Sequence, residues 1–231
     1  MRSARRTSFS RLLGVLLTVV LVGVVLPAAP ASAVDVRIDT RIFGVHDGGM
    51  SSVSSGTVGS LRLWDVGTTW RDIETSPGSY DFARLDGMVT AAQARNVEVT
   101  LVLGMTPDFY APADGGATSN PADLGAWARY VTAVVSRYQS FNGKRGIHAY
   151  QVWNEANVKS FWTGSPVQMA ALTKATWNAV KAVDKAAIVV GPAFAARIAE
   201  QTRGIGFFYY IKINGIAVWR YLDVISLNLY P

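Results

Sequence analysis

The 231-residue chain contains no cysteine and only two histidines, His46 and His148. Without cysteine there are no disulfides, no thiolate nucleophile and no cysteine-ligated zinc. The sequence also lacks an HExxH pair, a GxSxG elbow and a glycine-rich phosphate loop. We therefore expect no metal and no cofactor, and a fold that is stabilised by packing alone.

Long apolar runs are scarce as well. One run, residues 12–26, has 15 residues, which is too short to span a bilayer comfortably. It follows a segment with four arginines and precedes Ala31-Ser32-Ala33, an order typical of a cleaved secretory signal peptide. We expect residues 1–33 to be removed and the protein to be secreted, without a stable membrane anchor. An uncleaved tether is the alternative.

Net charge is low once that segment is set aside. Removing its four arginines and no acids lowers the formal charge from +6 to +2, so a nucleic-acid partner has no support in the composition. Residues 34–231 are enough for one domain with its own core. The oligomeric state remains open.

Short apolar segments alternate with helical patterns, which predicts an α/β fold with a parallel sheet. The expected strands are residues 41–46, 60–65, 97–103, 147–153, 186–190 and 223–230. The expected helices are residues 82–95, 121–138, 166–184 and 205–211, with N-caps at Asp81, Asn120 and Ser165. The clearest helical face is formed by Trp127, Tyr130, Val131, Val134, Val135 and Tyr138.

Two architectures fit this alternation. A doubly wound sheet would require a glycine fingerprint or a switch-point site. A (β/α)8 TIM barrel instead carries its polar residues at the carboxyl ends of its strands. Such residues are His46, Asp65, Thr106, Asn154, Glu155, Asn228 and Tyr230. A complete barrel has eight units and about 250 residues, so the six units predict an incomplete (β/α)8 barrel that is truncated after strand six.

The stretch IHAYQVWNEAN, residues 147–157, ends a buried strand in a polar cluster. Alternation would send Asn154 and Glu155 to opposite faces, but at a barrel rim the register breaks and both can reach a ligand. Asn154 and Glu155 could equally cap a following helix. His148, in mid-strand, is expected to be a core histidine.

Four stretches resemble a known group of enzymes. SLRLWD with WRDIE and GSYDFARLDGMV, then VTLVLGMTP, VWNEAN and DVISLNLYP, resemble in order the second, third, fourth and sixth strand regions of the clan A retaining glycoside hydrolases. The most similar branch is the family 39 β-xylosidase-like one. The resemblance covers nearly all of residues 34–231 and implies retaining hydrolysis of O-glycosidic bonds in an oligo- or polysaccharide.

The same resemblance implies roles for single residues. Glu155 matches the general acid/base, and Asn154 matches the asparagine that binds the sugar 2-hydroxyl. Arg62 matches an arginine below the site, while Asn228 and Tyr230 match positions that line the sugar subsite. The family's nucleophilic glutamate follows strand seven, which this sequence does not include.

Further substrate contacts are expected from side chains that follow the strands. Trp64 and Trp162 are expected to stack on sugar rings, and His46 to bind a sugar hydroxyl. Asp65 and Asp108 are weaker candidates for a substitute nucleophile, because rim carboxylates are often structural. Ala156 replaces the usual proline after the Asn-Glu pair.

Two other functions stay open. A carbohydrate-binding pseudoenzyme would need no second carboxylate, and an inactive gene fragment would neither bind nor fold well.

Overall fold

The computed structural model describes residues 39–46, 48, 58–196 and 208–229. The chain divides into two units, and every described residue belongs to the second, Ile38–Pro231. The expected signal peptide, residues 1–33, lies outside the described residues.

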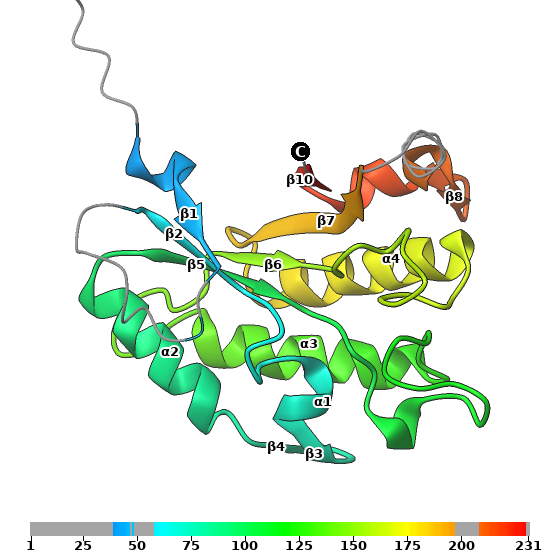
Figure 1. Ribbon diagram of the computed structural model, residues 1–231, viewed down its shortest axis with the longest axis horizontal. Coiled ribbons are helices and arrows are strands. Elements are labelled where there is room, and N and C mark those ends of the chain that lie inside the picture. Colours follow the sequence, from blue (N-terminus) through cyan, green and yellow to red (C-terminus); the bar gives the residue numbers. More distant parts are fainter. Residues whose placement is uncertain (1–38, 47, 49–57, 197–207, 230–231) are drawn as a thin grey trace, which may run out of the picture. The chain divides into compact units, whose positions relative to one another are not determined.

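Six parallel strands form one sheet whose strand order follows the chain, β1-β2-β5-β6-β7-β10 (Figure 1). They are β1 (Gly44–Val45), β2 (Ser60–Leu63), β5 (Glu98–Val102), β6 (Ala149–Gln151), β7 (Ile188–Ala195) and β10 (Val224–Asn228). A doubly wound sheet would reverse its order at a switch point, and this sheet does not. The architecture is therefore an incomplete (β/α)8 barrel, as predicted.

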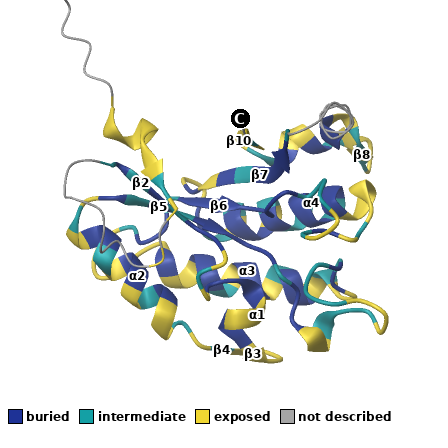
Figure 2. Ribbon diagram, in the orientation of Figure 1, coloured by how far each residue is buried: buried dark blue, intermediate teal, exposed yellow. Residues whose placement is uncertain are grey.

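Three long helices cover one face of the sheet: α2 (Ala83–Ala94), α3 (Leu124–Tyr138) and α4 (Pro166–Val183). Buried residues line the surfaces of the sheet and helices that face each other, as Figure 2 shows. The predicted face of α3 is confirmed, because all six of its residues are fully buried. The core therefore lies between the sheet and these helices.

The strands send different side chains to their two faces. On β2, Leu61 and Leu63 join the core with the helices, whereas Arg62 points to the opposite, inner face. The inner face borders a cavity of about 470 Å³. Its lining includes Arg62, Thr100, Gln151, Val190 and Ser226, from five different strands. Period-two alternation thus places polar groups inside the barrel and apolar groups under the helices.

Several boundaries differ from the predictions. Helix α3 begins at Leu124, with Asp123 as N-cap accepting from Gly125 N at 2.7 Å, so the cap predicted at Asn120 is wrong. Asn120 instead donates its amide to Pro121 O at 2.8 Å. Helix α2 begins at Ala83, and its N-cap is Phe82 rather than the predicted Asp81. The capping box at Ser165 is confirmed.

Short elements between the strands were missed. Residues Thr40–Ile42 form a 3-10 turn, so β1 is shorter than predicted. A short helix α1 (Trp70–Ile73) leads into the hairpin β3 (Glu74–Ser76) and β4 (Ser79–Tyr80). A second hairpin joins β8 (Lys212–Ile213) to β9 (Ile216–Ala217). It is followed by a 3-10 helix, Val218–Tyr221. Of the helix expected at 205–211, only 208–210 are described as helical.

Strand β7 continues beyond its predicted end at Val190. The pair Gly191-Pro192 lies beyond that predicted end, and the structure accommodates it in a bulge. Val224 of β10 lies opposite Val190, and Ser226 lies opposite Ala193, so β7 carries one extra residue there. Proline and glycine are tolerated in a strand at such bulges because the ladder is already interrupted.

Within the described ranges, no helix combines the length and apolar character needed to cross a membrane.

The capping box of α4 predicts a measurable loss of stability. Ser165 Oγ accepts from Gln168 N at 3.2 Å, and Gln168 Oε1 accepts from Ser165 N at 2.7 Å. Ser165→Ala should lower the free energy of unfolding by about 1 kcal/mol, since an N-cap acceptor is lost. Urea denaturation measures this. Ser136→Ala, on the exposed side of α3, is the control and should not destabilise. Equal losses in both variants would contradict the capping role.

The uncovered outer face of β10 predicts self-association. Ile225 and Leu227 are 53% and 47% exposed, and they alternate with Ser226 and Asn228, which line the inner cavities. In a barrel, a helix covers this outer face. We expect residues 34–231 to aggregate, and Ile225→Lys with Leu227→Lys to reduce light scattering at equal concentration. A wild-type chain that remains monomeric at high concentration would refute this.

Candidate active site

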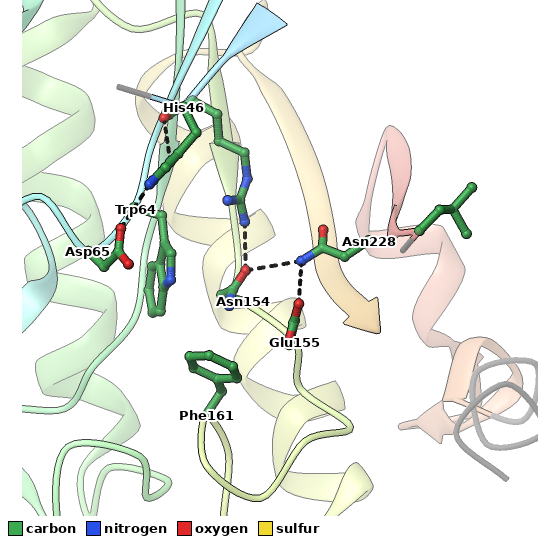
Figure 3. A pocket seen from close by; sticks show the side chains of 9 residues that line it. His46, Trp64, Asp65, Asn154, Glu155, Phe161 and Asn228 are labelled. Carbon is green, nitrogen blue, oxygen red and sulfur yellow. Dashed lines mark hydrogen bonds and ion pairs between the residues drawn. The ribbon is translucent and has the colours of Figure 1, made fainter. Parts of the chain in front are cut away.

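The carboxyl ends of β1, β2, β6 and β10 meet around one pocket of about 460 Å³ (Figure 3). Each strand contributes polar residues at or just after its end. The pocket is lined by His46, Arg62, Trp64, Asp65, Asn154, Glu155, Phe161, Asn228 and Leu229. Six predicted site residues therefore come together here: His46, Arg62, Trp64, Asn154, Glu155 and Asn228. Of the other two predicted site residues, Tyr230 lies outside the described residues, and Trp162 does not line the pocket.

Glu155 is held in a left-handed backbone conformation, with φ of 42°. This conformation costs a residue with a side chain on the order of 1 kcal/mol, so the surrounding structure must enforce it. Two contacts with β7 do so: Ala156 N donates to Ala193 O at 2.9 Å, and the Asn157 amide pairs with both backbone groups of Ala195. The break in strand register lets adjacent Asn154 and Glu155 both line the pocket.

Glu155 is a buried carboxyl group within a hydrogen-bond network. Glu155 is only 2% exposed, and its Oε1 accepts a hydrogen bond from Asn228 Nδ2 at 3.0 Å. The same Asn228 amide lies 3.4 Å from Asn154 Oδ1. A carboxyl group at the base of an open pocket, with a donor that fixes one oxygen, is placed to exchange a proton with a bound ligand.

Asn154 has a defined amide orientation. Its Oδ1 accepts from Arg62 Nη2 at 2.9 Å as well as from Asn228. Because only the oxygen can accept from these donors, the hydrogen bonds assign Oδ1 to that side. The Nδ2 group is then the end of Asn154 that can donate to a hydroxyl in the pocket.

His46 and Asp65 form a second pair at the rim. His46 Nε2 lies 2.9 Å from Asp65 Oδ1, and His46 Nδ1 lies 3.1 Å from the carbonyl oxygen of Arg62. Both side chains line the pocket, and Asp65 also has positive φ, 50°. Asp108, the other candidate for a substitute nucleophile, does not line the pocket. Its Oδ2 lies 3.8 Å from Arg71 Nη2.

The aromatic wall differs in part from the prediction. Trp64 lines the pocket, and the ring of Phe161 meets it edge-on with centroids 6.3 Å apart. Trp162 does not line the pocket: it is 4% exposed and packs edge-on against Trp153, with centroids 4.9 Å apart. Of two adjacent aromatic residues, Phe161 is the one that faces the pocket. Adjacency alone did not show which of the two would turn inward.

Trp70 and His148 lie away from the pocket. Trp70 is fully buried and donates to Glu74 Oε2 at 2.6 Å, with Tyr110 stacked on its ring. His148 lies just before β6, at the opposite end of the sheet from the pocket, and its Nδ1 accepts weakly from Val99 N at 3.4 Å. Burial lowers the pKa of His148, which favours the neutral imidazole. These residues serve the structure rather than the pocket.

Comparison with solved structures supports the fold. A monomeric β-xylosidase from Caulobacter crescentus CB15 is 23% identical with a TM-score of 0.58, over 80% of this chain and 40% of its own. A second structure, of a family 39 β-xylosidase from Caulobacter crescentus, is 24% identical with a TM-score of 0.57, over 80% and 45%. A family 39 enzyme from Xanthomonas axonopodis pv. citri is 23% identical with a TM-score of 0.53, over 73% and 34%.

This chain therefore spans less than half the length of each of these structures. No curated protein matches it. A family model, glycosyl hydrolases family 39, matches residues 58–230, which is well over half of the chain and includes most of the pocket residues. On this match, the chain belongs to glycosyl hydrolase family 39.

Proposed function

We propose that the protein hydrolyses O-glycosidic bonds of an oligo- or polysaccharide by a retaining mechanism, with Glu155 as the general acid/base. The observation that carries the proposal is the position of Glu155. It is a buried carboxyl at the end of β6, beside Asn154 and fixed by Asn228, in a pocket of a family 39 chain. The β-xylosidases among the similar structures make a β-linked xyloside the first substrate to test.

The chemistry divides into two displacements. In the first, Glu155 gives its proton to the leaving oxygen while a second carboxylate attacks the anomeric carbon, and the glycosidic bond breaks. In the second, Glu155 takes a proton from water, and the water oxygen displaces the enzyme carboxylate. The product keeps the anomeric configuration, and both carboxylates return to their initial state.

Substrate binding is assigned to the remaining pocket residues. Asn154 Nδ2 is oriented to donate to a sugar hydroxyl, and Trp64 with Phe161 offers an apolar surface for a sugar ring. Asp65, which pairs with His46, is assigned to hydroxyl binding rather than attack.

The nucleophile is expected on strand seven of a complete barrel. A retaining site needs its two carboxyl groups about 5 to 5.5 Å apart. Among the described residues, the only carboxylate that lines the pocket besides Glu155 is Asp65. Secretion is part of the same proposal. It rests on the signal-peptide pattern of residues 1–33 and brings the protein into contact with polysaccharides outside the cell.

A non-hydrolytic carbohydrate-binding protein is the second candidate. It is favoured by the aromatic wall of Trp64 and Phe161, which can bind a sugar without any second carboxylate. Calorimetric binding of xylobiose without release of xylose would favour this candidate. Release of product with retained configuration, followed by NMR, would favour the enzyme.

Replacement of the acid/base residue tests the proposal. In a chain with the complete barrel, Glu155→Gln should lower turnover of substrates with poor leaving groups about 10²- to 10⁴-fold, the usual contribution of general acid catalysis. Aryl glycosides with good leaving groups, which need no protonation, should still form the glycosyl-enzyme. Glu98→Gln, on β5 outside the pocket, is the matched control and should leave turnover unchanged. Unimpaired hydrolysis by Glu155→Gln would exclude the assignment.

A further inference from the structure

Gln151 lies on β6 below the pocket and is only 1% exposed. Its side chain points to the inner face of the sheet, beside Thr100 and Val190, in the cavity of about 470 Å³. The chain places it three residues before Asn154 and four before Glu155. Strand β6 thus carries a buried amide inside the barrel at its last residue, four residues before the proposed acid/base residue.

The Gln151 amide is turned toward Arg62. Its Oε1 accepts from Arg62 Nε at 2.8 Å, whereas its Nε2 is buried with no hydrogen-bond partner among the described residues. Leaving a buried donor unpaired is unfavourable. The amide nevertheless keeps this orientation, because the reverse would set an N–H against the N–H of the guanidinium.

The hydrogen bond between Arg62 and Gln151 also affects the orientation of Asn154 in the pocket. The guanidinium is planar and rigid, so fixing Nε also fixes the direction of Nη2. Arg62 Nη2 donates to Asn154 Oδ1 at 2.9 Å. Asn154 Oδ1 is thereby held toward Arg62, and its Nδ2 toward the pocket.

We propose that Gln151 is a positioning residue, which sets the amide orientation of Asn154 through Arg62 and so determines how tightly the pocket binds a sugar hydroxyl. The consequence for sugar binding rests on the proposed function, whereas the effect on Asn154 does not. A neutral amide suits this role because it orients the guanidinium without cancelling its charge.

The side-chain amide signals of Asn154 test the first step without any sugar. In ¹⁵N-labelled protein they are identified by their loss in Asn154→Asp. Gln151→Met has a similar shape but no acceptor, and it should shift or broaden these signals. Gln151→Glu keeps the acceptor and should leave them near their wild-type positions. Thr100→Val, an isosteric change in the same cavity, is the matched control and should leave them unmoved.

Calorimetry with xylobiose tests the second step. Gln151→Met should weaken binding about tenfold, as expected when a hydrogen bond to a charged group is lost, and Gln151→Glu should restore it to within about threefold. In an Asn154→Ala background, Gln151→Met should have no further effect, because both changes act through one group. A merely structural role would give additive losses.

Asn154 signals that stay unmoved in Gln151→Met would overturn the proposal, whatever the sugar data show. If Gln151→Met does not fold, Gln151→Glu decides: wild-type Asn154 signals support the proposal, and signals displaced well beyond those of Thr100→Val refute it. Failure of the wild-type protein to bind xylobiose would count against the proposed substrate only, since the amide signals still decide the role of Gln151.

Discussion

A cation on the inner face of the sheet constrains the whole site. Arg62 places a guanidinium inside the barrel, and a partly buried charge of this kind must be matched by acceptors. Gln151 and Asn154 supply them, from the strand that lies two positions away across β5. These hydrogen bonds on the inner face link β2 to β6 and to the segment after it, and Glu155 lies four residues beyond the end of β6.

The order and direction of the strands were open to prediction because they depend on repeated, local patterns. Alternation of apolar segments with amphipathic helices predicted the parallel sheet, and the polar residues that follow the strands predicted the pocket. Glu155, Asn154 and Arg62 come together because parallel strands end at one edge. All three residues line one cavity, and the roles that the resemblance to the family implies for them stay predictions.

The rest depended on contacts between distant segments, which no local pattern encodes. Phe161 rather than Trp162 faces the pocket because the Trp162 ring packs edge-on against Trp153. Strand β7 continues through Gly191-Pro192 because a bulge opposite β10 absorbs the extra residue. One missed hairpin did have a local signal: Asn214-Gly215, both with positive φ, is a typical two-residue turn between β8 and β9.

The strand order of the sheet follows the order of the chain from β1 to β10. Within this sheet, each strand therefore pairs with the sheet strand that precedes it along the chain. Among the described strands of this sheet, no early strand pairs with one from the far end of the chain. Because synthesis proceeds from the N-terminus, each strand of the sheet is made after the strand with which it pairs, and Arg62 on β2 is made before its hydrogen-bond partners Gln151 and Asn154.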